Sequence, residues 1–210
     1  MTDITADQAK RPHRHPGRDS RRTGEQGARR AEILDAAARL FAERGFHGVS
    51  IEELGAAVGV SGPALYKHFS GKEALLAEML LGISSRLHSG AGDLVTAAAT
   101  PEEALSALLR GHIAFSLREP YLITVHDREL GNVPEPQRRQ IRRLQRLYVE
   151  EWVTVLTELR PGRPAARLRA ATHAVFGLLN STPHSAGDLP ADDTATLLYE
   201  LAHTALVNIP

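Results

Sequence analysis

The side chains with the clearest chemical use lie between Ser50 and Lys72, and their chemistry is the binding of phosphate groups and base edges. Two short helical segments are predicted here, joined by a tight turn at Gly59-Val60-Ser61, which is the geometry of a helix-turn-helix. Small residues at the start of the second segment let its backbone approach a groove closely, and free N–H groups at helix starts attract phosphate oxygens. The residues expected to make such contacts are Ser50, Gly62, Pro63, Tyr66, Lys67, His68 and Lys72.

The same residues have a plainer interpretation as a structural helical hairpin. In that case Tyr66 would belong to the core, as Phe69 is expected to do in either case, and Lys72 would only be solvated. A cation in the first turn of a helix is poorly matched to the helix dipole. The position of Lys72 therefore needs another reason, and the binding of a phosphate group would supply one. The charge count favours the structural interpretation, because residues 25–75 hold six Lys or Arg against seven Asp or Glu and are therefore not basic.

Apolar spacing and capping signals predict the helices that must position these residues. Apolar side chains at helical spacing indicate a first helix at Gln26–Arg44, which Gly45 ends. Capping boxes follow at Ser50–Glu53 and Ser70–Glu73, and Ser61 can cap the segment between them. The motif is therefore expected to form two short helices between the first helix and a longer one.

The rest of the chain is also predicted to be helical. The helix that opens after Ser70 is expected to end near Leu87, with Ser89–Ala99 as a loop or a frayed end, and Thr100–Glu103 forms a third capping box. Further helices are expected near residues 101–117, 120–130, 135–160, 164–182 and 190–207. No stretch alternates with the period of a strand, so the fold is predicted to be all-α.

Charge and composition divide the 210 residues into three parts. Residues 1–30 carry eight Lys or Arg against four Asp or Glu, so residues 1–24 are predicted to be a disordered basic arm that either attracts phosphate or has no role. Residues 25–70 are predicted to be a helix-turn-helix DNA-binding domain, and residues 71–210 a ligand-binding and dimerisation domain. The net charge of zero and 42% hydrophobic residues suit a folded protein.

Several classes of protein and site are disfavoured. The chain has no Cys, which removes disulfides, thiolate catalysis and thiolate zinc sites. It contains no Gly-x-Ser-x-Gly, Walker A, Gly-x-Gly-x-x-Gly or His-Glu-x-x-His motif, so no enzyme activity, catalytic residue or cofactor is expected. Its His residues lack metal-site spacing, so no metal is expected. No apolar run approaches the roughly 20 residues that span a bilayer, so a cytoplasmic protein without a membrane partner is expected.

The stretch Gly45–Leu76 closely resembles the DNA-binding domain of the TetR family of bacterial transcription regulators. The resemblance extends over about Ala28–Leu81, and its most specific residues are Gly59-Val60-Ser61, Leu65-Tyr66, His68-Phe69 and Lys72-Glu73. It implies an all-α homodimer of about nine helices. In such a dimer the first three helices bind operator DNA, the fourth links them to the core, and the last two form a four-helix bundle with the partner subunit.

The resemblance also implies roles for individual residues. Phosphates would be held by Ser50, Tyr66, His68 and Lys72, whereas Ser61, Gly62, Pro63 and Lys67 would lie at the groove face. Two departures weaken the match: Val49 stands where the family often has Thr, and Leu54-Gly55 where it often has Ile-Ala. Val49 removes one hydroxyl that could bind a phosphate, and Gly55 lowers the helix propensity of its segment.

Residues 101–207 are expected both to dimerise and to bind a ligand. The dimer contact is expected through the helices near 164–182 and 190–207, mainly on the resemblance. Their apolar seams, which can also be intramolecular core, are Leu168, Ala171, Val175, Leu178 and Leu179, and Leu197, Leu198, Leu201, Ala205 and Leu206. A helical bundle with convergent polar groups is where small ligands bind. The candidate ligand residues are His112, Phe115, Tyr121, His126, Tyr148, Trp152, His173, Phe176 and Asn180.

Two charged segments in this half each allow two interpretations. His126–Glu129 is favoured as an internal ion-pair cluster that joins helices. Arg138–Arg146 is expected to be a solvated face, with contact to an acidic ligand group, such as a coenzyme A phosphate, as the alternative. Because relatives with similar sequences sense acyl-CoA thioesters, the resemblance favours that class of effector.

These observations predict a ligand-responsive DNA-binding transcriptional regulator, which we expect to be a repressor released from a palindromic operator by a small-molecule effector. The expected partners are double-stranded operator DNA, a second copy of the chain and the effector. The alternative is a helical protein-interaction module without DNA binding, which gives no reason for Lys72 and His68 at their spacing.

Overall fold

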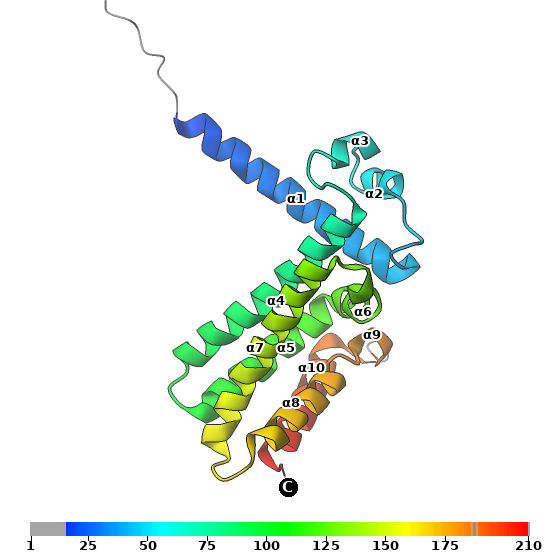
Figure 1. The fold of residues 1–210 in the computed structure, drawn as a ribbon. Helices are drawn as coiled ribbons and strands as arrows, with labels where there is room; N and C mark the ends of the chain where they lie inside the picture. The colour runs from blue at the N-terminus through cyan, green and yellow to red at the C-terminus, as the bar shows by residue number, and fades with distance from the viewer. Residues whose placement is uncertain (1–15, 186, 188, 210) are drawn as a thin grey trace, which may run out of the picture.

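A computed structural model describes residues 16–185, 187 and 189–209, with side chains described from Gln26 onward. Within those residues the secondary structure is entirely helical, with no strand. The all-α prediction is therefore confirmed. Figure 1 shows a helical bundle with a smaller helical domain at one end, from which one long helix enters the bundle.

The smaller domain contains three helices, α1 (Pro16–Arg44), α2 (Ile51–Ala57) and α3 (Gly62–Leu65). Helix α1 begins ten residues before the predicted start at Gln26, so residues 16–24, which were expected to be disordered, are helical. Proline is well tolerated at the first helical position, and no further Pro interrupts the polar residues that follow it. The predicted arm also includes residues 1–15, which lie outside the described residues.

Helix α4 (Lys72–Ala97) joins the smaller domain to the bundle. The prediction of a loop at Ser89–Ala99 is wrong, because α4 continues through Gly90 and Gly92. Each Gly costs about 1 kcal/mol in a helix, but Ala91 between them is buried in the bundle core, and this packing outweighs the weak propensity. The predicted capping box at Ser70 is also wrong, since Gly71 is the N-cap and no side chain caps it.

The bundle helices follow the predicted ranges within a few residues. They are α5 (Pro101–Arg118), α6 (Pro120–Glu129), a 3-10 turn (Leu130–Asn132), α7 (Glu135–Leu159), α8 (Ala165–Leu179), α9 (Thr182–Ser185) and α10 (Ala191–Val207). The predicted cap of α5 is confirmed, because the Thr100 side chain accepts from the Glu103 N–H at 3.2 Å. The single helix predicted at 164–182 is divided, since Asn180 ends α8 before the short α9 begins.

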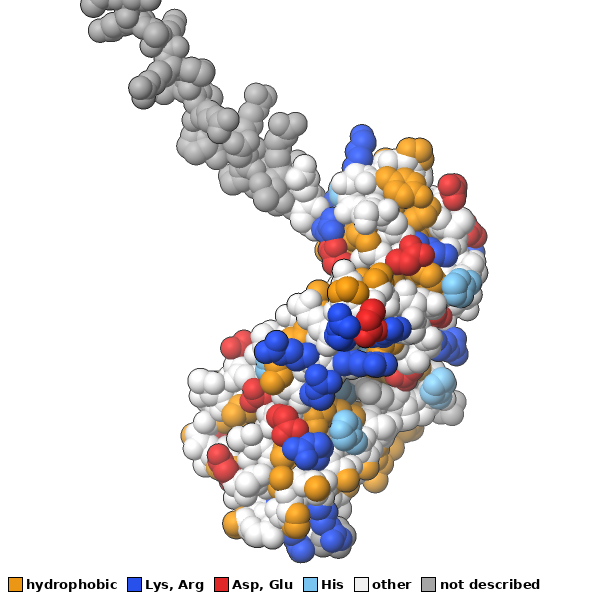
Figure 2. Space-filling view, viewed as in Figure 1, with side chains coloured by type: hydrophobic (Ala, Val, Ile, Leu, Met, Phe, Trp, Pro, Cys, Tyr) orange, Lys and Arg blue, Asp and Glu red, His pale blue; other side chains and the backbone are white. Residues whose placement is uncertain are grey.

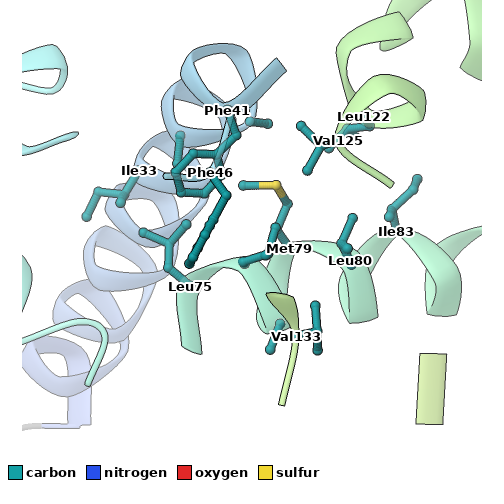
Figure 3. Packing of buried hydrophobic residues seen from close by; sticks show 14 of the residues in the cluster. Ile33, Phe41, Phe46, Leu75, Met79, Leu80, Ile83, Leu122, Val125 and Val133 are labelled. Carbon is teal, nitrogen blue, oxygen red and sulfur yellow. The ribbon is translucent and has the colours of Figure 1, made fainter. Parts of the chain in front are cut away.

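Two hydrophobic cores meet along α4. The first core holds together α1, the N-terminal half of α4 and α6. Figure 3 shows Met79 of α4 between Phe46, which follows α1, and Val125 of α6. The second surrounds Trp152 of α7 and includes Ala91 near the other end of α4. Helix α4 is therefore packed into both the small domain and the bundle.

The seams predicted for dimerisation divide between the inside and the surface. Five of their leucine and valine residues are buried within this subunit: Leu168, Val175, Leu179, Leu198 and Leu206. By contrast, Leu197 is 44% exposed and Leu201 is 48% exposed on α10. The buried part of the seams is intramolecular core, and only the exposed part is free for a second copy of the chain.

Candidate DNA interface and effector cavity

The turn between α2 and α3 is held by tight backbone contacts. The predicted capping box is present at Ser50, whose Oγ accepts from Glu53 N at 3.2 Å and whose N–H donates to Glu53 Oε2 at 2.8 Å. The Val60 N–H donates to the Gly55 carbonyl at 2.9 Å. A Cβ on Gly55 would lie 2.6 Å from the Val60 carbonyl oxygen, so Gly55, which departs from the family pattern, permits this close approach.

Helix α3 and the turn that follows it present most of the predicted DNA-facing residues to the surface. Tyr66 is 56% exposed, the largest exposure among the large hydrophobic side chains described. The other exposed residues on this face are Ser61, Pro63 and Lys67, whereas His68 is half-buried. Gly62 differs from the prediction because it is buried against α2, where a Cβ would lie 3.5 Å from Glu52 Oε1. The turn therefore offers a compact polar and aromatic surface with Tyr66 at its centre.

Lys72 has a structural partner that the sequence did not reveal. Its ammonium group donates to the carbonyls of Phe46 at 2.7 Å and Val49 at 2.8 Å, and it lies 4.4 Å from the centre of the Phe46 ring. These contacts fix the loop between α1 and α2 against the start of α4. An ammonium group has three N–H donors, so one remains for a phosphate oxygen.

Arg30 of α1 ties the first helix to α4 and was missed by the sequence reasoning. Its guanidinium group makes two hydrogen bonds with the Glu78 carboxylate and one with the His68 carbonyl, and it lies 4.3 Å from the centre of the Phe69 ring. Paired Arg–carboxylate hydrogen bonds fix geometry as well as adding stability. The orientation of α3 is therefore coupled to α4 through one side chain.

A cavity of about 270 Å³ lies among α4, α5, α6, α7 and α8 in the bundle. Seven of the nine candidate ligand residues line it: His112, Phe115, His126, Tyr148, His173, Phe176 and Asn180. Most of the remaining wall is apolar and includes Ile83 and Leu87 of α4. The wall also includes Ser84 and Gln145, which sequence reasoning missed, and Asp127, which it placed in an ion-pair cluster.

The other two candidates do not line this cavity. Trp152 is fully buried behind the wall, with its ring edge-on to Phe176 at 5.0 Å between ring centres. Tyr121 lies at the contact with α1, where its hydroxyl donates to Asp35 at 2.5 Å and Arg39 stacks 4.3 Å from its ring centre. Burial, aided by the hydrogen bond to Asp35, raises the pKa of Tyr121 to about 12. Tyr121 therefore joins α6 to the DNA-binding domain.

The deep polar groups of the cavity are paired with one another. One ring nitrogen of His112 is 2.9 Å from the Tyr148 hydroxyl, and the other is 3.0 Å from Asn180 Oδ1. Burial lowers the pKa of His112 to about 4, although the hydrogen bond to Asn180 opposes this shift. A neutral imidazole has one donor and one acceptor, so it can donate to Asn180 and accept from Tyr148.

The mouth of the cavity is polar. His126 of α6 is hydrogen-bonded to Gln145 of α7 and lies 3.3 Å from Asp127. Asp127 and His173 of α8 are exposed. The cavity therefore has an apolar interior, where the polar groups are hydrogen-bonded to one another, and a polar rim that is exposed to solvent. This arrangement suits a ligand with an apolar end and a polar end.

The ion-pair cluster expected at His126–Glu129 is not formed in this way. Glu129 is buried and accepts from the Phe46 N–H at 3.1 Å and from the Asn132 side chain at 2.7 Å. The segment does join helices, as predicted, but through the backbone of the α1–α2 loop. The Phe46 N–H donates to the Glu129 carboxylate, which was expected to pair with a cationic side chain.

The described part of the chain contains no group of three or more His, Cys, Asp or Glu side chains that could hold a metal ion. None of the described helices combines the length and apolar character needed to cross a membrane.

Comparison with known proteins assigns the family. Residues 33–79 match the family described as bacterial regulatory proteins, tetR family, and residues 98–206 match the tetracyclin repressor-like C-terminal domain. The chain belongs to the TetR family. It is thus a DNA-binding, ligand-responsive transcriptional regulator, as the sequence predicted, and the interaction-module alternative is not favoured. TetR-family regulators bind operator DNA and effectors, usually as dimers.

Individual relatives support this assignment. The transcriptional repressor KstR2 of Mycobacterium tuberculosis H37Rv is 28% identical over 136 residues, which are 64% of this chain and 68% of KstR2. A TetR-family regulator from Bordetella parapertussis superposes with a TM-score of 0.73 at 25% identity, covering 82% of this chain and 93% of that one. AibR, solved with isovaleryl coenzyme A and operator DNA, has a TM-score of 0.67 at 22% identity, covering 82% and 97%. This last likeness is one of fold.

Proposed function

We propose that this TetR-family regulator is a dimeric repressor that leaves a palindromic operator when an acyl-CoA thioester occupies the cavity. The observation that carries the proposal is that the helices walling the cavity also hold the DNA-binding domain. Helix α4 contributes Ile83 and Leu87 to the cavity wall, and its Glu78 forms the hydrogen-bonded ion pair with Arg30. Helix α6 contributes His126 to the wall and Glu129 to the contact with Phe46.

Operator binding in this proposal uses α3 as the recognition helix. Tyr66 and Lys67 would reach base edges or phosphates in the major groove, with Ser61 and Pro63 beside them. Ser50, His68 and the remaining N–H donor of Lys72 would hold phosphates on either side. Such contacts position the protein through phosphates and read the sequence through bases.

Dimerisation in this proposal uses α8 and α10. Leu197 and Leu201 expose apolar surface on α10, and Ala170 and Ala174 are exposed on α8, where small side chains allow close helix packing. A two-fold dimer would set the two α3 helices into successive major grooves, about 34–36 Å apart or somewhat more. A palindromic operator follows from that symmetry.

Release follows from a difference in affinity between two conformations. A ligand changes an equilibrium only by binding one state more tightly than the other. A thioester that fits the cavity only when α4 and α6 move apart would favour that conformation. The contacts of Arg30 with α4 and of Phe46 with α6 would then move together with those helices. The spacing of the two α3 helices would then no longer match the operator.

The acyl-CoA class is supported by the chemistry of the cavity. Its deep polar groups are already paired, so an apolar chain beside His112 leaves no polar group unsatisfied. The polar rim at His126, Gln145 and His173 suits a thioester and its amide linker. Two proteins of the same fold are described with such ligands, AibR with isovaleryl coenzyme A and Bacillus subtilis FadR with stearoyl-CoA.

The proposal is tested by selecting DNA from a random library with the purified protein and measuring affinity for the enriched sequence by fluorescence anisotropy. We expect a palindromic sequence, steep salt dependence, and release by at least one thioester in a saturated acyl-CoA series. Selective binding that no thioester disturbs would refute the effector class. An enrichment without any symmetric sequence would refute the dimeric operator.

A further inference from the structure

We infer that Arg142 and Arg146 of α7 form a phosphate-binding site at the mouth of the cavity, which holds the nucleotide end of the effector outside the bundle. This inference rests on the proposed acyl-CoA effector. It gives a binding site to the nucleotide end of that effector, which the cavity does not hold. It also gives a role to the arginine-rich face of α7, which DNA binding and dimerisation leave unused.

The position of the two arginines follows from helical spacing. Helix α7 contributes Gln145, Tyr148 and Val149 to the cavity wall. Arg142 precedes Gln145 by three residues and Arg146 precedes Val149 by three, and residues three apart are neighbours on a helix surface. Both arginines are exposed, whereas Tyr148 and Val149 are buried. The two guanidinium groups therefore stand on the solvent side of the residues that line the cavity.

Neither arginine forms a salt bridge with a described carboxylate, although the pKa of Glu135 is lowered by its hydrogen bond with Arg138 and, more weakly, by the charge of Arg142. Arg138 and Arg139 both pair with Glu135 at the start of α7, but Arg142 and Arg146 have no ion pair or hydrogen bond with any side chain that the structure describes. Figure 2 shows Lys and Arg side chains gathered across this face of the molecule. In a chain with a net charge of zero, such a local excess of positive charge favours an anionic partner.

The carboxylates near the mouth do not cancel this charge. Glu150, one turn beyond Arg146, is held by Arg169 of α8 through bonds of 2.6 and 2.8 Å. Asp127 is the one carboxylate among the residues that line the cavity, and it lies beside His126. The rim therefore keeps an excess of positive charge on its α7 side.

The size of the cavity explains why phosphates would lie there. About 270 Å³ is at the small end of the roughly 300–1,000 Å³ typical of ligand pockets, so the cavity can take an acyl chain but not the nucleotide as well. The phosphates of a bound thioester must then remain at the rim. Guanidinium groups suit them because they bind phosphate oxygens through paired hydrogen bonds.

The test compares each acyl-CoA with the N-acetylcysteamine thioester of the same acyl group, which keeps the thioester but has no phosphate. The readout is the concentration of each that releases half of the bound operator. For the natural protein we expect the CoA thioester to act at a concentration about tenfold lower, since each exposed ion pair adds little. The double variant R142Q/R146Q should lose this advantage and respond equally to both compounds.

The matched control is R139Q/R143Q, which removes two charges at the same spacing from the same helix, three residues nearer its start and about 60° further around the helix from Gln145 and Val149. It should keep the tenfold preference, and both double variants should bind operator as the natural protein does. Equal potency of the two compounds on the natural protein would overturn the inference but leave the effector class standing. Release by neither compound would overturn both. A fall in operator affinity confined to R142Q/R146Q would assign these arginines to DNA.

Discussion

Lowering the pH from 7 to 5 should destabilise the protein through His112. The imidazole has an ordinary pKa of about 6.5 in the unfolded chain, but burial lowers its pKa to about 4 in the folded state. Between these values the unfolded chain takes up a proton that the folded protein excludes. The stability contribution is therefore intact above pH 6.5, and it is lost as the pH falls toward 4.

The size of the effect follows from the two pKa values. One pKa unit corresponds to about 1.4 kcal/mol, so the full shift is worth about 3 kcal/mol, of which about 2 kcal/mol is lost between pH 7 and pH 5. Because Asn180 and Tyr148 occupy both ring nitrogens, a protonated His112 would have to donate to the Tyr148 hydroxyl oxygen and could no longer accept from that hydroxyl.

The assay is urea unfolding followed by the fluorescence of Trp152, the one tryptophan of the chain, whose ring centre lies 6.2 Å from that of His112. His112→Gln is the control, because it keeps a donor and an acceptor without a titratable ring. At fixed protein concentration, the difference in unfolding free energy between natural protein and variant should fall by about 2 kcal/mol from pH 7 to pH 5. Parallel pH profiles would refute the buried, neutral imidazole.

Five further substitutions test the other contacts. Tyr66→Ala and Lys67→Ala should each lower operator affinity at least tenfold with an unchanged dimer in sedimentation; full affinity in either variant would remove that residue from the groove face. Lys72→Ala should reduce the salt slope of DNA binding by about one, and a loss confined to one base would contradict a phosphate contact. Glu129→Ala should lower the unfolding free energy by about 1–3 kcal/mol, because the Phe46 N–H is left unpaired; an unchanged urea midpoint would argue against this bond. Leu201→Glu should yield monomers in gel filtration, and a persistent dimer would place the interface elsewhere.

The sequence was most informative where local chemistry sets the structure. The capping box at Ser50 and the turn at Gly59 depend on residues within a few positions of each other, and both are present. The helix-turn-helix and the helical bundle were predictable for this reason. The same local logic failed at Gly90 and Gly92, where burial of Ala91 in the bundle keeps α4 helical.

Long-range contacts explain the other differences. Seven candidate ligand residues meet at the cavity, and three of them, His112, Tyr148 and Asn180, are polar groups that find their hydrogen-bond partners there. Tyr121 carries the same signal but meets Asp35 of α1, which lies 86 residues away in the chain. Arg30 pairs with Glu78 across 48 residues. No spacing rule within one helix could predict either pair.

The central claim is that cavity occupancy and operator binding oppose each other through α4 and α6, and reciprocity tests it most directly. If a thioester weakens operator binding by some factor, operator must weaken thioester binding by the same factor. Titration of the most potent acyl-CoA into the protein, alone and saturated with operator, measures this factor by calorimetry. We predict weaker thioester binding in the presence of operator, by the factor found for DNA release. Equal thioester affinity with and without operator would contradict the coupling.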